Sequence, residues 1–446
     1  MSRTPFRNTV VSVPCALALC AFALLPSGTA TAATHTVGNC NDSGPGSLRN
    51  VVANAASGDT IDLTSLACSR IVLTNRGIQV PQDDLNVVGR HREAITIDGN
   101  RNSRVFVHTG TGTLRLRRVS IANGYVTGSE VVGGCIRSLG GVELIGSRLH
   151  HCEVRGQGGL KPFAGGGGIS ANRVLLSWSS AYSNVAASSV FNIGGAVHAG
   201  EIVLYRSQVY GNRARQGGGV WGRSVTATSS VISGNEGGGI DISSEACRDP
   251  ATVCRLTLSK STVSANEGGG IWAYYADDAA IIESTVSDNV ASYVSAAILP
   301  SDGETRIFNS TIAFNQNRPT GPSAECRGAI EAFQLLRLES SIIARNTCSL
   351  GDDNDIYGDP SQGARIVGGN NIIGNSDLPV PPDTILARPR LGPLTDNGGP
   401  TPTRKPQADS PALDRGSNPL NHQYDQRGSG FPRVKGGFPD IGAVER

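Results

Sequence analysis

The residues of this chain best suited to chemistry are aromatic and acidic side chains that follow glycine-rich runs. Trp221 and Trp272 are two of only three tryptophans, and Asp241 lies between them in the sequence, at the same place after a glycine run. Aromatic faces give a sugar ring apolar contact, and neighbouring carboxylates accept hydrogen bonds from its hydroxyl groups. We therefore expect a carbohydrate-binding site formed by Trp221, Asp241 and Trp272, with His198 and Tyr274 beside them.

The same region contains carboxylates that could cleave a polysaccharide. Glycoside hydrolysis needs two carboxyl groups about 5–10 Å apart on either side of the scissile bond. Asp241 with Asp277 or Asp278 is the candidate catalytic set. An elimination reaction would instead need acidic ligands for Ca²⁺ and an arginine or lysine base. A serine nucleophile is not expected, because the sequence has no G-x-S-x-G motif.

A run of aspartates is the candidate metal site. Asp352, Asp353 and Asp355 in GDDNDIYGD offer the oxygen ligands that Ca²⁺ prefers, but without the spacing of an EF-hand. A solvated turn is the commoner role of such a run, so we expect no cofactor, with calcium as the alternative. His150 and His151 are neighbours in a predicted strand, where successive side chains point to opposite faces, so they are not expected to share a metal.

An internal repeat positions these candidates. A serine recurs five residues before an asparagine, with Ala, Val or Ile two residues after the serine, and a glycine-rich run ending in Ile or Val follows. The serine–asparagine pairs are Ser179–Asn184, Ser207–Asn212, Ser230–Asn235, Ser261–Asn266, Ser284–Asn289, Ser310–Asn315 and Ser341–Asn346. The shortest unit is about 20 residues, which leaves no room for a useful helix between its turns.

Each unit offers three short alternations of apolar and polar residues, as in GGGVWG, RSVTATS and SVISGN. Three strands and three turns make one coil of a parallel β-helix, whose coils stack about 4.8 Å apart. We expect the Ile and Val side chains to form ladders inside. We expect the asparagines to adopt left-handed backbone angles and to bond to one another. The predicted fold class is all-β, a right-handed parallel β-helix solenoid of about 11–12 coils.

If the Ile or Val after each glycine run points inward, the next residue points outward. The resulting ladder consists of Arg137, Ser170, His198, Trp221, Asp241, Trp272, Leu299 and Glu331. The two tryptophans would be exposed two coils apart, roughly 10 Å from one another. The competing interpretation is that they lie under inserted loops or are scattered surface residues.

The N-terminus indicates export. A basic start, an apolar stretch and the A-x-A arrangement Ala30-Thr31-Ala32 predict a signal peptide over 1–33. Of ten cysteines, Cys15 and Cys20 lie in this leader, and an even number remains for disulfides. The sequence-local pairs are Cys40–Cys68, Cys135–Cys152, Cys247–Cys254 and Cys326–Cys348, although other connectivities stay open. Cys135 takes a glycine position of the repeat, and Cys152 takes an asparagine position.

The stacked coils need caps at both ends. Ser47 is expected to cap a short helix whose apolar face is Leu48, Val51, Val52 and Ala55, with Gly58 ending it. The proline- and glycine-rich segment 376–446 predicts an extended C-terminal cap packed on the solenoid. The predicted domains are therefore the leader, a β-helix with its N-terminal cap over 34–375, and a C-terminal module over 376–446.

Charge excludes some partners. The chain has 39 Lys and Arg, of which Arg3 and Arg7 lie in the leader, against 37 Asp and Glu. A mature net charge near zero does not suggest nucleic acid as a partner. Outside the leader, no stretch is apolar enough to span a membrane. A polysaccharide or cell-surface glycan is the expected partner, and the oligomeric state is left open.

The coil pattern resembles the right-handed parallel β-helix proteins of the pectate-lyase-like superfamily. The leader-side text NCNDSGPGSLRNVVANAASGDTIDL and the tail LGPLTDNGGPTPT…SPALDRG…DQRG…DIGAVE resemble a bacterial envelope group. In that group the tail is a choice-of-anchor module. The N-T-D, D-D and G-H-G motifs of β-helix polygalacturonases do not occur here as a set.

Three functional hypotheses follow from this pattern. The first is a secreted or periplasmic or outer cell-envelope protein that acts as an adhesin-type binding module toward polysaccharide. The second is a polysaccharide lyase or glycoside hydrolase acting in the β-helix groove. The third is a structural surface protein without a specific ligand. A β-helix is a scaffold, so only a site can distinguish them.

Overall fold

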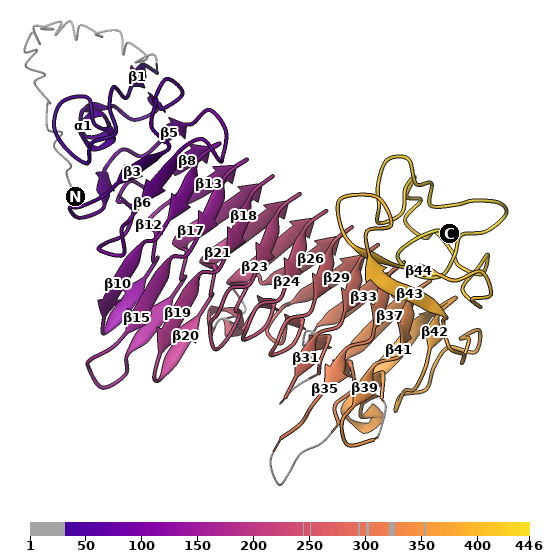
Figure 1. Cartoon of the computed structure of the whole chain (residues 1–446). Helices are drawn as coiled ribbons and strands as arrows, with labels where there is room; N and C mark the ends of the chain where they lie inside the picture. The colour runs from indigo at the N-terminus through magenta and orange to yellow at the C-terminus, as the bar shows by residue number, and fades with distance from the viewer. Residues whose placement is uncertain are drawn as a thin grey trace, which may run out of the picture. The chain divides into compact units, whose positions relative to one another are not determined.

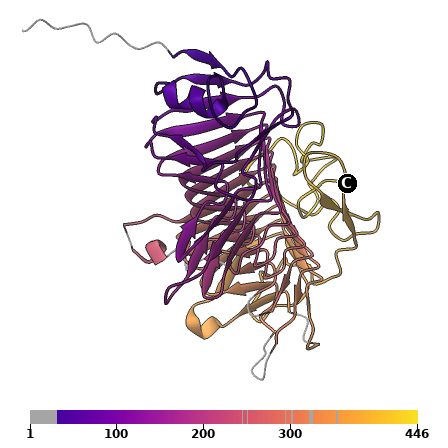
Figure 2. The ribbon, with the colours of Figure 1, turned by 60° about the vertical axis from the view of Figure 1, so that its left-hand side comes forward.

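The computed structural model describes residues 32–243, 245–249, 251–292, 295–299, 303–320, 326–351 and 354–446. Almost all of the predicted leader lies outside these residues. Within them, parallel strands dominate and there is one α-helix (Figure 1). The fold is the predicted right-handed parallel β-helix, and three columns of strands run along it (Figure 2).

One column is a 12-stranded parallel sheet, which gives the number of coils as 12. Its strands are β3 (Arg70–Val72), β6 (Thr96–Asp98), β9 (Ser120–Ala122), β14 (Arg148–His150), β18 (Ser180–Tyr182), β22 (Gln208–Tyr210), β24 (Val231–Ser233), β27 (Thr262–Ser264), β30 (Thr285–Ser287), β34 (Thr311–Ala313), β38 (Ile342–Ala344) and β42 (Ile372–Ile373).

The other two columns are joined into a 21-stranded sheet, because three strands run across both. These long strands are β17 (Ile169–Ser177), β21 (Val197–Tyr205) and β23 (Val220–Thr228). Two of the three expected alternations are therefore one continuous strand in these coils.

One of the joined columns carries the strands that follow the glycine runs. It consists, besides the long strands, of β4 (Ile78–Val80), β7 (Phe106–His108), β12 (Ile136–Ser138), β25 (Ile240–Asp241), β28 (Ile271–Trp272), β32 (Ile298–Leu299), β36 (Ile330–Ala332) and β40 (Ile356–Gly358). The other consists of β1 (Thr34–Thr36), β2 (Thr60–Asp62), β5 (Leu85–Val88), β8 (Thr113–Arg117), β13 (Gly141–Ile145), β26 (Arg255–Ser259), β29 (Asp278–Ile282), β33 (Glu304–Phe308), β37 (Leu335–Glu339) and β41 (Arg365–Gly369).

Additional short strands extend some coils sideways into three-stranded sheets. They are β10 (Tyr125–Gly128), β15 (Glu153–Gly156) and β19 (Val185–Ser188); β11 (Glu130–Val132), β16 (Phe163–Gly165) and β20 (Phe191–Ile193); and β31 (Val290–Ala291), β35 (Gln316–Asn317) and β39 (Thr347–Cys348). The repeat pattern did not predict these extensions, which lie in the variable segments between the asparagine of each unit and the glycine-rich run that follows it.

The core is a set of stacked aliphatic side chains inside the coils. Equivalent residues of consecutive coils pair in register, and each is almost fully buried: Ile136, Ile169, Val197, Val220, Ile240, Ile271, Ile298 and Ile330. Burial of each such side chain contributes about 1.5–3 kcal/mol of transfer free energy. The interior ladders are as predicted.

The asparagines form a continuous buried ladder. The side-chain Nδ2 of each donates to Oδ1 of the next at 2.9 Å, from Asn184 through Asn346. The prediction that these asparagines are left-handed is wrong. The residue before each one holds the positive φ, as in Ala265 (53°) and Phe314 (64°). This residue makes the corner with its side chain outward, and the asparagine after it points inward, where its amide can stack.

The N-terminal cap is the expected helix. Helix α1 (Leu48–Asn54) begins after Ser47, whose side chain accepts from Asn50 N–H, and it buries Leu48 and Val52 against the core. It ends at Asn54, short of Gly58. No described helix is long and apolar enough to cross a membrane.

The C-terminal module, residues 376–446, packs on the outer face of the 12-stranded sheet (Figures 1 and 2). It contains the antiparallel pair β43 (Leu391–Thr395) and β44 (Thr403–Pro406). Gln426, fully buried, bonds with Thr262 Oγ1 at 2.9 Å and Thr285 Oγ1 at 2.6 Å. The buried Glu283 pairs with Lys260 and with His422.

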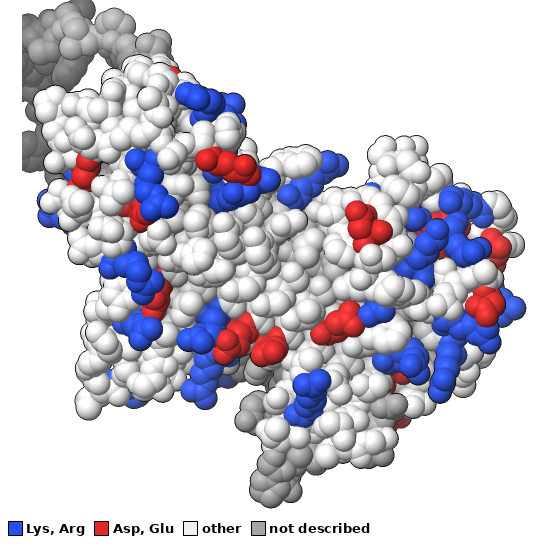
Figure 3. All heavy atoms as spheres, viewed as in Figure 1, with Lys and Arg blue, Asp and Glu red and all other residues white. Residues whose placement is uncertain are grey.

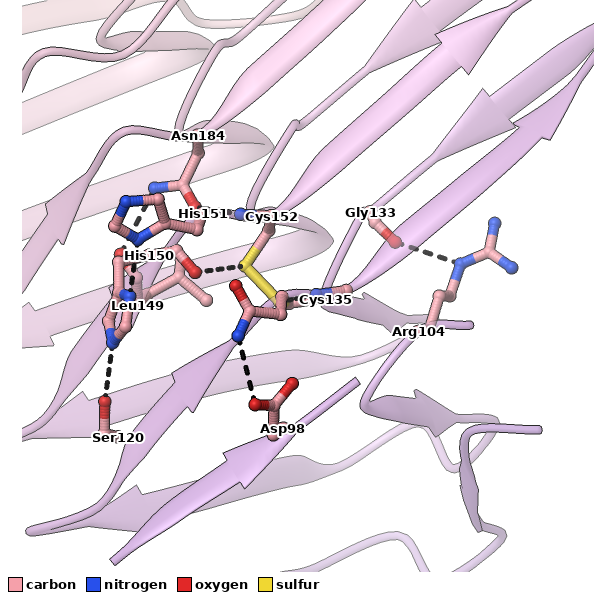
Figure 4. Close-up of a disulfide and its surroundings, with 12 residues drawn as sticks. Asp98, Arg104, Ser120, Gly133, Cys135, Leu149, His150, His151, Cys152 and Asn184 are labelled. Carbon is pink, nitrogen blue, oxygen red and sulfur yellow. Dashed lines mark hydrogen bonds between the residues drawn. A yellow bond between two sulfur atoms is a disulfide. The ribbon is translucent and has the colours of Figure 1, made fainter. Parts of the chain in front are cut away.

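All four sequence-local disulfides are present: Cys40–Cys68, Cys135–Cys152, Cys247–Cys254 and Cys326–Cys348. Figure 4 shows the second of them, in which Cys152 takes the asparagine position and its N–H donates to Asn184 Oδ1 at 3.1 Å. A disulfide thus replaces the amide contact at the start of the ladder. Four disulfides are typical of an extracellular or periplasmic protein.

Candidate functional site

The predicted outward ladder forms with the expected register. Arg137 pairs with Ser170, and the series continues through His198, Trp221, Asp241, Trp272 and Leu299. Gln79 and Val107 extend it toward the N-terminal cap, and Glu331 and Tyr357 extend it toward the C-terminal end. These side chains therefore lie in one column along the solenoid.

Half of this column is closed to solvent, which corrects one expectation. Asp241 is only 2% exposed, and burial raises its pKa to about 7. Trp221 and Trp272 are half-buried, and the indole N–H of each is buried without a partner in the described part of the chain. The chain leaves the coil directly after Asp241, in the segment that Cys247–Cys254 closes. Asp241 is therefore not exposed on the outward column, although the sugar-binding hypothesis required it to be exposed.

The other acidic candidates have structural partners. Asp277 accepts the N–H of Cys254 at 2.7 Å, and both carboxylate oxygens of Asp278 accept from Arg306 at 2.8 and 2.6 Å. Tyr274 packs against Phe333, with ring centroids 5.5 Å apart. None of these residues lines the open cavities of the column described below.

The open half of the column borders two adjoining cavities, which we call the arginine groove. One, of about 450 Å³, is lined by Val132, Arg137, Ser138, Leu139, Ser170, Ala171, Asn172, His198, Ala199, Gly200, Trp221 and Arg223. The other, of about 420 Å³, is lined by Arg76, Gly77, Gln79, Asn102, Ser103, Arg104, Val107, Tyr125, Val126 and Thr127. They adjoin because Arg104 Nε, from the second cavity, donates to Val132 O, at the edge of the first, at 3.2 Å.

Regular strands and lateral extensions build this groove together. Its floor is β4, β7, β12 and the starts of β17, β21 and β23, and β10 and β11 supply residues of its side. Gly200 suits this position, because a Cβ here would lie 2.9 Å from the backbone oxygen of Asn172. From Gln79 to Trp221 the column has six rungs, so the floor is roughly 24 Å long at the usual spacing.

The groove carries unpaired positive charge. Arg76, Arg104, Arg137 and Arg223 line it, and the described residues that line it include no Asp or Glu. None of the four forms a salt bridge with a described residue. On the neighbouring column four outward arginines have a carboxylate partner: Arg115–Glu143, Arg173–Glu201, Arg306–Asp278 and Arg337–Glu304. Three others, Arg117, Arg255 and Arg365, are exposed and form no salt bridge with a described residue.

Positive and negative side chains lie side by side on one face of the molecule (Figure 3). The face drawn in Figure 3 shows Lys and Arg next to Asp and Glu over much of its charged surface. The concentration of one sign in the groove is therefore a local feature that the net charge of the chain conceals.

Two groups in the groove have altered proton affinity. Burial, with a smaller contribution from Arg137, lowers the pKa of Arg104 to about 10. Burial also lowers the pKa of His198 to about 4, so this imidazole is neutral at pH 7. His198 lies edge-on to Trp221, with ring centroids 5.0 Å apart. The coils of His198 and Trp221 therefore add two aromatic rings to the groove, beside the guanidinium of Arg223.

The predicted calcium ligands are only partly visible. Asp352 and Asp353 lie outside the described residues. Asp355 ends the asparagine ladder, where Oδ1 accepts from Asn346 and Oδ2 accepts from Asn375 N–H at 3.0 Å. The described residues contain no group of three or more His, Cys, Asp or Glu that could hold a metal.

The premise that His150 and His151 point to opposite faces is wrong, whereas the expectation that they share no metal stays a prediction, and the sequence reasoning missed one tryptophan. His150 Nδ1 and His151 Nδ1 lie 2.8 Å apart (Figure 4), because His151 is a left-handed corner residue where strand alternation ends. Trp178 is 53% exposed, more than either tryptophan of the predicted column. The sequence did carry a signal for the surface around Trp178. In three consecutive coils an aromatic residue stands two positions before the asparagine position: His150, Tyr182 and Tyr210.

No protein-family model and no curated protein matches this chain. Among solved structures it is similar to the crystal structure of pectate lyase Pel9A, with a TM-score of 0.48 and 13% identity over 94% of this chain and 98% of that one. At this identity the likeness concerns the fold alone. The resemblance of the tail to an envelope group stays a prediction.

Proposed function

We propose that this protein is a secreted or cell-envelope binding module for an acidic polysaccharide, which it holds in the arginine groove. The observation that carries the proposal is the set of four arginines that line one groove without a carboxylate partner, where no described lining residue is Asp or Glu. An anionic sugar chain supplies the missing carboxylates. An adhesin-type role fits a site that is extended along the solenoid.

The chemistry of the groove favours a sugar over a simple anion. Besides the arginines, the groove offers amide groups on Gln79, Asn102 and Asn172 for hydroxyl groups, and the rings of Tyr125 and Trp221 for apolar contact. Such sites combine apolar surface with a few placed polar groups. The original expectation of sugar binding is thus retained for His198 and Trp221, and the role of Asp241 and Trp272 becomes indirect support of the neighbouring rungs.

The test is binding of polygalacturonate, a carboxylate-bearing chain, measured by calorimetry against neutral dextran. Arg137→Gln with Arg223→Gln is expected to weaken binding at least about 100-fold, since two lost charged hydrogen bonds, each worth about 1.5–3 kcal/mol, total about 3–6 kcal/mol. Arg173→Gln is the matched control, because Arg173 lies on β17 with Ser170 but is paired with Glu201 at 3.4 Å. Equal affinity of the double variant and wild type would refute the proposal.

An enzyme is the second candidate, and one observation favours it. The lowered pKa of Arg104 brings an arginine nearer to the range of a useful base, and this residue lines the groove beside Arg137. In an elimination, the base removes the proton next to the uronate carboxyl group. The electron pair forms a C=C bond and the sugar on the next carbon leaves. A lyase would be supported if wild type raises the ultraviolet absorbance of polygalacturonate and Arg104→Gln does not. If wild type leaves the absorbance unchanged, binding is the only function of the groove that remains.

A further inference from the structure

We infer a second binding site for an anionic sugar, separate from the arginine groove, on the outer face of the 12-stranded sheet. A cavity of about 400 Å³ lies there over β14, β18 and β22. Arg92, Arg148, Trp178, Tyr182, Arg206 and Tyr210 are the lining residues that matter for the argument. The groove lies on a different column of strands, so the two sites are independent.

Aromatic rings form one side of this second site. Tyr182 stacks on His150 at 4.9 Å and on Tyr210 at 5.0 Å, each pair within 9° of parallel. These rings come from one position in three consecutive coils, so they form a stacked row, and Tyr182 and Tyr210 line the cavity. Trp178, in the neighbouring corner, is 53% exposed. Such surfaces contact sugar rings at low entropic cost.

The backbone holds two of these side chains outward. Trp178 and Arg206 are corner residues with φ of 53° and 46°, in the left-handed region that costs a non-glycine residue about 1–2 kcal/mol. The guanidinium of Arg206 lies 4.7 Å from the centroid of the Trp178 ring. A cation and an aromatic ring are thus presented together at corners where glycine would be the least strained residue. The equivalent corner one coil earlier is indeed a glycine, Gly146 (φ 58°).

Charge identifies the ligand as an anion. Three arginines line the cavity and none of its described lining residues is Asp or Glu. Arg148 pairs with Glu93 at 2.5 Å, and Arg92 donates to Trp178 O at 3.4 Å. Arg206 forms no salt bridge with a described residue and has only ring contacts. A sulfate or carboxylate on a sugar would give Arg206 the charged partner that it lacks.

The same row of corners is occupied in later coils. Lys260 donates to the carbonyl groups of Tyr424 and Asp425, and Asn309 Nδ2 donates to Ser417 O at 2.7 Å, so the C-terminal module covers the row there. The cavity at Trp178 and Arg206 has no C-terminal residue in its lining. The corner residues of the earlier coils are therefore left uncovered at Trp178 and Arg206, where they present an aromatic ring and a guanidinium group.

The experiment uses the full chain carrying Arg137→Gln and Arg223→Gln, so that the groove is weakened and the second site is measured. Dextran sulfate, polygalacturonate and plain dextran are the probes. In this background Arg206→Gln and Trp178→Gly are each expected to weaken binding to the two anionic probes about tenfold. Glycine adopts the φ of Trp178 without strain, so that variant is expected to fold.

Arg118→Gln is the matched control, since Arg118 is an exposed corner residue of the same row (φ 55°) that does not line the cavity. A preference between the two anionic probes assigns the anion as sulfate or carboxylate. The inference is overturned if Arg118→Gln weakens binding as much as Arg206→Gln, if plain dextran binds as well as dextran sulfate, or if Trp178→Gly leaves glycan binding unchanged. Failure of the groove proposal would appear separately, as unaltered binding in the background variant.

Discussion

Truncating one asparagine of the buried ladder tests how the coils are held in register. Asn266 makes four side-chain hydrogen bonds: Oδ1 accepts from the N–H and Nδ2 of Asn235 at 3.0 and 2.9 Å, and Nδ2 donates to Ile232 O at 3.1 Å and Asn289 Oδ1 at 2.9 Å. Asn266→Ala removes all four. Asn266 itself is fully buried, so water cannot replace them without entering the corner.

The expected loss follows from which partners are left without a bond. Asn289 Oδ1 keeps the backbone N–H of residue 266 at 3.1 Å, and Asn235 Nδ2 keeps Val209 O at 3.1 Å. The Asn235 backbone N–H and one hydrogen of its amide lose their acceptor. Each buried unsatisfied group costs about 1–3 kcal/mol. We therefore expect Asn266→Ala to lower the free energy of unfolding by about 3–4 kcal/mol.

The measurement is urea unfolding followed by far-ultraviolet circular dichroism. Glu267→Ala is the control, because Glu267 is the adjacent, exposed residue and its truncation should change the free energy of unfolding by less than about 0.5 kcal/mol. If Asn266→Ala lowered the free energy of unfolding no more than Glu267→Ala, the amide ladder would be a consequence of coil stacking and would not stabilise the stack.

Three further outcomes are expected. Replacing Cys135 and Cys152 together by alanine should lower the free energy of unfolding by about 3 kcal/mol, because their separation of 17 residues closes a loop of that size; an unchanged urea midpoint would contradict this. Asp241 has a pKa raised to about 7, so the folded state binds the extra proton and wild type should lose stability from pH 4 to pH 8 by roughly 3 kcal/mol more than Asp241→Asn; parallel pH profiles of the two proteins would refute the burial argument. Glu283→Gln removes the buried partner of Lys260 and His422, so limited trypsin digestion should release C-terminal fragments faster while the solenoid spectrum is unchanged; an unchanged digestion rate would show that other contacts hold the module.

The repeat made most of the fold predictable. Once Asn235 and Asn266 are placed above one another, the order of strands, the interior Ile and Val ladders and the outward column follow from the period alone. The corner geometry was less accessible, because the left-handed residue before each asparagine varies in type, from Ala265 to Phe314. A repeat recognised by its identical residues cannot reveal a corner position at which the residue type varies from coil to coil.

The site was harder to predict because it depends on what interrupts the repeat. The column order around Trp221 was right, but sequence spacing does not say that an insertion after Asp241 leaves this carboxylate buried. Arg76, Arg104 and Arg223 approach one groove from coils with different insertions, so their spacing carries no period. Only the structure shows that they line one groove without an Asp or Glu among its described residues.

The most direct test of the arginine groove is a crystal structure of the protein with an acidic oligosaccharide such as trigalacturonate. The proposal predicts the sugar chain along the column between Gln79 and Trp221, with a carboxylate bonded to Arg137 or Arg223. A groove that stays empty at a saturating concentration, in crystals where no neighbouring molecule blocks it, would contradict the proposed function.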